Sequence, residues 1–149
     1  MITVHEGDLF ASGAEALVNP VNCVGTMGKG LALAFKKRFP ELVPLYEQAC
    51  RDKRLALGKV WIAERPQGSP RYVVHFPTKH HWRDDSYSWA IAKGLMVLRG
   101  EIEARSIQSI AIPALGCGLG GLSWSNVEPM MREELADLNA KVFLYKPGA

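Results

Sequence analysis

Two short apolar segments, each followed closely by a glycine-rich segment and then by a helical pattern, constrain the fold of this chain most. The apolar segments are residues 16–19 and 107–112, and the glycine-rich segments are residues 22–30 and 116–121. Short, nearly continuous apolar runs are typical of strands that are buried on both faces. The pattern therefore predicts an α/β protein whose buried strands end in glycine-rich loops.

The alternation of strands and helices extends along the whole chain. Further strands are expected at residues 2–10, 58–64, 71–76 and 141–145, and helices at 28–39, 41–53, 87–105 and 125–138. Ser125 and Glu128 have the spacing of a capping box, which predicts that Ser125 caps the last helix. The segment 2–10 is expected to be an edge strand that ends in a turn at Gly7 and Asp8. Together these elements predict one domain, residues 1–149, with a three-layer α/β/α architecture and a mainly parallel sheet.

The composition is that of an ordinary soluble domain, which needs no disulfide or metal for stability. Of the 149 residues, 48% are hydrophobic and 22% are charged, which excludes a disordered chain. The three cysteines lack a C-x-x-C spacing, so we expect a reducing cytoplasm and no structural zinc. We expect no membrane span, because the charge-free segment 106–127 is interrupted by proline and glycine. A net charge of +3 permits a nucleic-acid partner without requiring one.

The two glycine-rich segments are candidate phosphate-binding loops. Ligands of parallel α/β sheets bind at the carboxyl ends of the strands, where both segments are expected to lie. Glycine lets backbone N–H groups approach phosphate oxygens, and a following helix N-terminus favours negative charge. The pair predicts a pyrophosphate held from both sides. The alternative for either loop alone is close packing of a helix against a strand.

Two familiar nucleotide-binding motifs do not fit these loops. The first loop has Gly28 and Lys29, as in a P-loop, but Gly30 follows where a serine or threonine is needed, and Cys23 replaces the earlier glycine. The second loop contains the G-x-G-x-x-G pattern over residues 116–121. Only 28 residues follow it, too few for the rest of a dinucleotide-binding half, so a nicotinamide dehydrogenase is disfavoured.

Three polar side chains outside the glycines have both a functional and a structural interpretation. Asp8 follows the first strand, where it could accept a hydrogen bond from an adenine amino group or act as a turn or cap aspartate. Asn22 could hold ribose hydroxyls or its own loop backbone. Lys79 follows the strand at 71–76 and could supply an amine nucleophile for an anomeric carbon, or be a solvated surface lysine.

The residues after Lys79 and two basic clusters suggest contacts with nucleic acid. Trp82 and Arg83 could stack on a base and pair with phosphate, although a tryptophan that partly covers the core is common. His80 and its neighbour point apart on a strand, so no metal site is expected. The basic clusters, residues 36–38 and 51–54, lie at predicted helix ends, where they could also complement the helix dipole.

Four segments resemble motifs typical of macrodomains, namely residues 7–9, 18–22, 28–32 and 113–118. The resemblance covers essentially the whole chain. It implies a mixed six-stranded sheet between helices and a site for ADP-ribose, with Asp8 at the adenine, Asn22 at the distal ribose and residues 116–121 around the diphosphate. The implied ADP-ribose-binding residues are Asp8, Leu9, Asn19, Asn22, Gly28, Lys29, Gly30, Gly116, Cys117, Gly118, Leu119, Gly120 and Gly121.

Within the macrodomains, residues 27–36, 78–79 and 116–119 resemble the branch that holds the human terminal ADP-ribose glycohydrolase and the DarG antitoxins, and residues 76–83 look most like DarG. That resemblance implies removal of ADP-ribose from thymidine in single-stranded DNA, reversing a DarT-like toxin. It also implies that Lys79 is catalytic, with Asn22 as its partner, and that no cofactor or metal is required. His80, Trp82 and Arg83 are the DNA-contact candidates, and the chain is expected to act as a monomer.

The resemblance leaves one step and two other functions open. The human branch member uses an aspartate where this chain has Gly120, so Asn22, His80 or water could resolve a lysine adduct. A hydrolase of protein-linked or O-acyl ADP-ribose could use the same lysine. A non-catalytic ADP-ribose reader would keep Asp8 and the glycine loops but would not need Lys79.

Overall fold

The structure is a computed structural model that describes residues 1–148. The strands of this part are β1 (Ile2–His5), β2 (Ala16–Val21), β3 (Trp61–Glu64), β4 (Tyr72–Pro77), β5 (Ser109–Ile112) and β6 (Lys141–Tyr145). The α-helices are α1 (Gly30–Arg38), α2 (Val43–Arg51), α3 (Ser88–Ala104) and α4 (Trp124–Glu134). Short 3-10 helices are η1 (Leu9–Ala11), η2 (Pro40–Leu42) and η3 (Gly118–Gly120). None of the helices described is long and apolar enough to cross a membrane.

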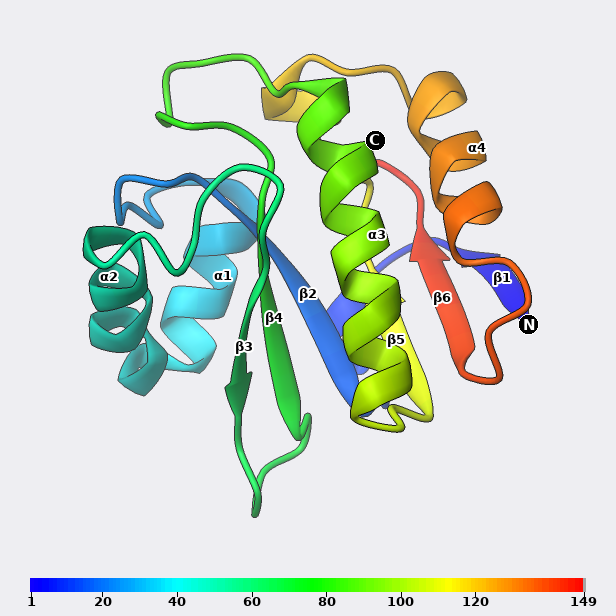
Figure 1. Ribbon diagram of the computed structural model, residues 1–149. Coiled ribbons are helices and arrows are strands. Elements are labelled where there is room, and N and C mark those ends of the chain that lie inside the picture. Colours follow the sequence, from blue (N-terminus) through cyan, green and yellow to red (C-terminus); the bar gives the residue numbers. More distant parts are fainter. Residues whose placement is uncertain (149) are drawn as a thin grey trace.

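The strands form one six-stranded sheet in the order β1-β6-β5-β2-β4-β3 (Figure 1). Every neighbouring pair is parallel except β3 and β4, which are antiparallel. Strand β2 lies between β5 and β4, so the loops that follow these three strands emerge side by side at one edge of the sheet. The predicted mixed, mainly parallel sheet of a three-layer α/β protein is confirmed.

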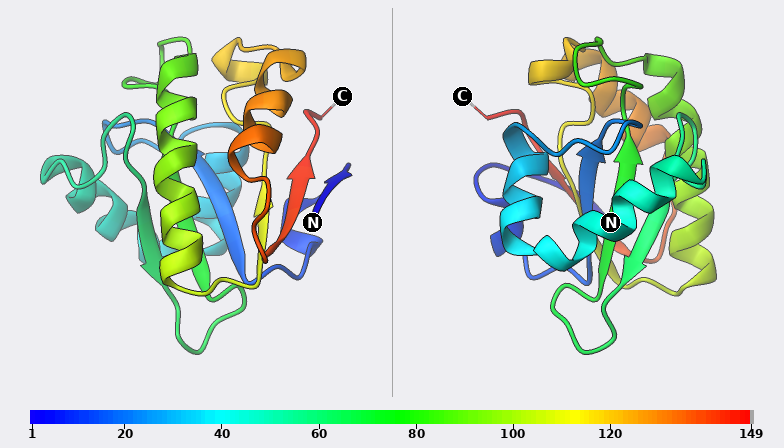
Figure 2. Two further views of the ribbon diagram at one scale, coloured as in Figure 1. Left: turned by 45° about the vertical axis from the view of Figure 1, so that its right-hand side comes forward. Right: turned by 90° about the vertical axis from the view of Figure 1, so that its left-hand side faces the viewer.

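Alternate residues of the strands face two separate apolar layers. Val18 and Val74 pack with the buried faces of α3 and α4 on one side of the sheet. Leu17 and Val73 face the other side, where they pack with Phe35 of α1. The right-hand view of Figure 2 shows the sheet between α1 and α3. This packing fixes the carboxyl ends of the strands, because a strand shifted by one residue would exchange its two faces.

Several predicted features differ in detail from the structure, among them the bounds of the helix predicted at 125–138, which ends at Glu134, and of the strand predicted at 58–64, which begins at Trp61. Of the segment predicted at 2–10, only Ile2–His5 form the edge strand; the predicted turn follows at Gly7, which has a φ of 97°, and η1 begins at Leu9. The helix predicted at 41–53 is divided into η2 and α2 and ends at Arg51. The predicted capping box is wrong, since Ser123 is the N-cap of α4 and the Ser125 hydroxyl lies 2.7 Å from the Ser123 hydroxyl.

Candidate active site

Three loops meet at the carboxyl edge of the sheet, and backbone hydrogen bonds join them. The segment after β4 bonds to the first glycine-rich loop, where the Cys23 N–H donates to the His80 carbonyl at 2.8 Å. The same segment bonds to the second glycine-rich loop, where the Ser86 N–H donates to the Gly120 carbonyl at 2.9 Å. In Figure 1 these loops lie together above β2, β4 and β5. The predicted convergence of the two glycine-rich loops is therefore observed.

Lys79 lies where the two glycine-rich loops come together. Its side chain is half-buried, and Nζ donates to the Leu119 carbonyl at 3.4 Å. The Leu119 side chain reaches the first loop, since its Cδ1 lies 3.4 Å from the position that a Cβ on Gly30 would occupy. The Lys79 carbonyl accepts a hydrogen bond from the Cys23 thiol at 3.5 Å. The structure thus places the amine at the junction of the two loops, in a solvent-exposed contact with the Leu119 carbonyl.

Asn22 organises the first glycine-rich loop. Its Oδ1 accepts hydrogen bonds from the N–H groups of Val24 and Thr26, at 3.1 and 3.3 Å, and its Nδ2 donates to the Thr26 carbonyl at 2.7 Å. The structural interpretation, in which Asn22 holds its own loop, is what the geometry favours. One N–H of Nδ2 is left for a ligand, so the predicted contact with the distal ribose stays a prediction.

Tyr46 of α2 supports Asn22, and the sequence offered no signal for this role. The buried Tyr46 hydroxyl lies 2.9 Å from both the backbone oxygen and Oδ1 of Asn22. Burial is the main cause that raises the pKa of Tyr46 far above its usual range, and the neighbouring Cys50 is the second. The phenol therefore stays protonated and donates its hydrogen to Asn22.

The second glycine-rich loop is shaped by a residue that sequence reasoning missed. The Ser86 side chain is buried, and its hydroxyl has no hydrogen-bond partner in the part of the chain that is described. A Cβ on Gly120 would collide with the Ser86 hydroxyl and would lie 3.0 Å from the Ser86 Cβ. A side chain at position 120 would therefore require the Ser86 side chain to shift. No motif surrounds Ser86, so only the tertiary contact reveals its role.

The other predicted residues of the loops are also brought to this edge. Gly116 and Gly118 have φ angles of 75° and 65°, which glycine adopts without strain. Cys117 lies between them, half-buried, and burial raises the pKa of its thiol. Gly28 and Lys29 are exposed directly before α1, and Gly30 is exposed as its first residue.

Asp8 and Asn19 occupy different surroundings. Asp8 caps η1, since its Oδ1 accepts the Phe10 N–H at 2.9 Å, and Oδ2 lies 3.9 Å from the Arg38 guanidinium. Its cap role is thus observed, while the contact with adenine stays a prediction. Asn19 is fully buried inside β2, with Nδ2 3.9 Å from the Met27 sulfur. The structure places Asn19 beneath the first loop and does not bring it to the surface of the site.

The DNA-contact candidates form an exposed turn beside Lys79. The Asp84 carboxylate accepts the His81 N–H at 3.0 Å and closes this turn. Trp82 is 47% exposed, outside the core, and the Arg83 guanidinium carbon lies 4.7 Å from the centre of its ring system. His80 is exposed as well. An aromatic ring and a cation are therefore presented together next to the candidate nucleophile.

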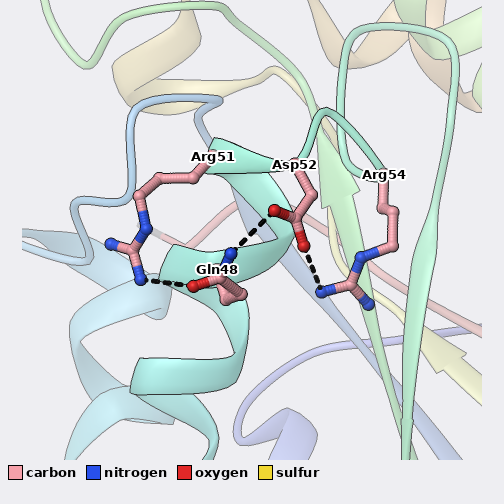
Figure 3. Close-up of polar contacts among 4 residues, drawn as sticks. All are labelled: Gln48, Arg51, Asp52 and Arg54. Carbon is pink, nitrogen blue, oxygen red and sulfur yellow. Dashed lines mark hydrogen bonds and ion pairs between the residues drawn. The ribbon is translucent and has the colours of Figure 1, made fainter.

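The basic cluster at the end of α2 makes local contacts instead. Arg51 donates to Gln48 at 2.9 Å, Gln48 donates to Asp52 at 2.7 Å, and Arg54 pairs with Asp52 at 3.2 Å (Figure 3). These exposed contacts form a chain around the helix end. The geometry favours the interpretation in which these basic side chains interact with the end of α2.

The fold and these loops agree with the comparisons with known proteins. The family model of the Macro domain matches residues 18–131. The chain belongs to the macrodomain family. The solved macrodomain of Mycobacterium tuberculosis DarG superposes with a TM-score of 0.96 at 43% identity, covering 99% of both chains.

Three curated relatives extend the comparison. The DNA ADP-ribosyl glycohydrolase of Mycobacterium tuberculosis is 44% identical over 147 residues, which cover 96% of this chain and 42% of that protein. The DNA ADP-ribosyl transferase-DNA ADP-ribosyl glycohydrolase fusion protein of Thermosipho africanus is 36% identical, covering 98% and 42%. Human ADP-ribose glycohydrolase OARD1 is 28% identical, covering 97% and 90%. The chain thus spans about two fifths of the length of these bacterial relatives.

Proposed function

We propose that this macrodomain is a glycohydrolase that removes ADP-ribose from thymidine bases of single-stranded DNA, with Lys79 as its nucleophile. The observation that carries the proposal is the position of Lys79, whose Nζ lies 3.4 Å from the Leu119 carbonyl where the two glycine-rich loops meet. The resemblance of residues 76–83 to DarG and the names of the bacterial relatives support DNA as the substrate.

The shape of the site suits an elongated ligand. Asp8 follows β1 at one edge of the sheet, and Lys79 follows β4, four strand positions away. At about 4.8 Å between neighbouring strands, this separation is about 19 Å. A ligand with adenine near Asp8 and its distal ribose near Lys79 would lay its diphosphate across the glycine-rich loops between them. The N-terminus of α1 after Lys29 adds partial positive charge there.

The proposed reaction proceeds in two steps at the anomeric carbon of the distal ribose. The Lys79 Nζ forms a bond to that carbon while the bond from the carbon to thymine breaks, and one proton of the amine passes to the thymine nitrogen. Water then adds its hydroxyl to the same carbon, the bond from the carbon to Nζ breaks, and the remaining proton of the water returns to Nζ, which restores the lysine. Water is the co-reactant, and we propose that no cofactor or metal takes part.

The test uses a single-stranded oligonucleotide that carries ADP-ribose on one thymidine. Wild-type protein, Lys79→Ala and Lys141→Ala are incubated with it, and free ADP-ribose is measured by mass spectrometry. Lys141 is a matched control, because it is an exposed lysine at the opposite end of the sheet. We expect release by wild type and Lys141→Ala and none by Lys79→Ala.

The other outcomes separate the alternatives. Release by Lys79→Ala at the wild-type rate would contradict the role of the lysine. Wild-type activity on ADP-ribosylated glutamate peptides, but not on DNA, would contradict the substrate. ADP-ribose binding without turnover of either substrate would indicate a reader.

We further propose that the chain counteracts a DarT-like DNA ADP-ribosyl transferase. The fusion of both activities that the name of the Thermosipho africanus relative describes supports this pairing. Co-expression of such a transferase should arrest growth, and wild type but not Lys79→Ala should restore it. Equal protection by Lys79→Ala would contradict an enzymatic antitoxin and favour protection by binding.

A further inference from the structure

Two large aromatic side chains are exposed at the start of α3. Tyr87 and Trp89 are 41% and 55% exposed, although tyrosine and tryptophan are usually largely buried. Their rings lie 28° from parallel, with centres 6.2 Å apart. Together the two exposed rings form an aromatic surface that the mechanism above does not use.

This aromatic surface is continuous with the candidate active site. The Tyr87 N–H donates to the Thr78 carbonyl at 3.2 Å, one residue before Lys79. The preceding residue, Ser86, is bonded to Gly120 of the second glycine-rich loop. Figure 1 shows the start of α3 beside η3 and the loop that follows β4. A strand of nucleic acid that delivers one base to Lys79 would therefore pass near Tyr87 and Trp89.

The charges around the aromatic surface suit phosphate groups. Lys93 is exposed one helical turn after Trp89, and Arg83 lies over Trp82 on the adjoining turn. Neither cation forms an ion pair within residues 1–148. Of the nearby acids, Asp84 is turned toward the His81 N–H, and Asp85 lies against Gly121 of the second loop.

We propose that Tyr87 and Trp89 form a stacking platform for the unmodified bases that flank the ADP-ribosylated thymidine in single-stranded DNA. The proposal rests on the proposed function for its substrate, but binding of plain DNA tests it separately. Every unpaired base has a face that can stack on an aromatic ring, whereas the faces of paired bases are covered within a duplex. Cations beside the rings would hold the backbone between successive bases.

The first experiment measures binding of unmodified DNA. A fluorescein-labelled oligothymidylate of about 12 nucleotides, and a duplex of equal length, are titrated with each variant by fluorescence anisotropy. We expect the Tyr87→Ala/Trp89→Ala double variant to bind the single strand at least about tenfold more weakly than wild type. Met96→Ala is the matched control, because Met96 is 61% exposed and lies two turns further along the same helix. It should bind like wild type.

Two results would overturn the platform. One is equal affinity of the double variant and wild type for the single strand. The other is an equal loss of affinity in Met96→Ala, which would point to a general effect on α3. Tighter binding of the duplex than of the single strand by wild type would overturn recognition of unpaired bases. Binding of free ADP-ribose by calorimetry, unchanged in the double variant, shows that the fold is intact.

The second experiment compares substrates of different length. For an ADP-ribosylated oligonucleotide, the double variant should raise KM about tenfold and leave kcat unchanged, while ADP-ribosylated thymidine alone should be hydrolysed as by wild type. Equal effects on both substrates would contradict a role for flanking bases. If wild type hydrolyses neither substrate, the proposed function fails, and the DNA-binding experiment still decides whether the platform exists.

Discussion

The hydroxyl of Ser86 lies directly against Gly120, so a side chain at position 120 of the second glycine-rich loop would require the Ser86 side chain to shift. The resemblance described above implies an aspartate at this position in the human glycohydrolase. In this chain the Ser86 side chain occupies that space. The Ser86 N–H also donates a hydrogen bond to the Gly120 carbonyl of the loop. A side chain at position 120 and the present position of the Ser86 hydroxyl are therefore mutually exclusive.

The first prediction concerns this space. Gly120→Asp should destabilise the protein by about 1–3 kcal/mol, because an added side chain in a packed position forces its neighbours to shift. The double variant Gly120→Asp/Ser86→Gly should recover part of that loss. Urea unfolding, monitored by circular dichroism, measures the stability of both variants. A single variant as stable as wild type would show that the loop accommodates the side chain freely.

Much of the fold could be predicted from the sequence because apolar periodicity and turn residues determine it locally. The strand at 141–145 was predicted with its observed bounds. The site was only partly predictable. Asn22, Lys79 and the glycines lie in recognisable segments, whereas Ser86 and Tyr46 act through contacts with residues 34 and 24 positions away in the chain. Local pattern also failed at Ser125, because Ser123 two residues earlier begins the helix instead.

The second prediction concerns the support of Asn22 by Tyr46. Tyr46→Phe removes the hydroxyl that lies 2.9 Å from Asn22 and leaves a buried acceptor with fewer donors. The free energy of unfolding should fall by about 1–2 kcal/mol, and the affinity for ADP-ribose should fall several-fold because the first loop loosens. Tyr72→Phe is the control, since Tyr72 is buried in β4 and its hydroxyl forms no hydrogen bond within the described residues. Equal effects of the two changes would contradict a specific role for Tyr46.

The third prediction concerns His75, which is buried in β4 between Tyr46 and Trp61. Burial lowers the pKa of His75 from 6.5 to about 4. Below pH 6.5 the unfolded chain therefore binds a proton that the folded chain does not, so stability falls as the pH drops from 6.5 toward 4.

The contribution of His75 to this fall is on the order of 3 kcal/mol at most. His75→Gln cannot titrate, so its stability should depend less steeply on pH between about pH 7 and pH 4.5 than that of wild type. Urea unfolding at several pH values compares the two proteins. Parallel pH profiles would show that His75 does not cause the acid sensitivity.

The fourth prediction concerns the Cys23 thiol, which joins the first glycine-rich loop to the Lys79 carbonyl. Burial is the main cause that raises the pKa of Cys23 from 9.0 to about 11, and the neighbouring Cys50 is the second. Because the thiolate is the reactive form, Cys23 should react with iodoacetamide about a hundredfold more slowly at neutral pH than an unperturbed thiol. Peptide mass spectrometry of native and urea-unfolded protein gives the two rates for the same residue. Equal rates would mean that the loop opens faster than the reagent reacts, and the hydrogen bond from Cys23 to the Lys79 carbonyl would then not hold the Lys79 segment in place.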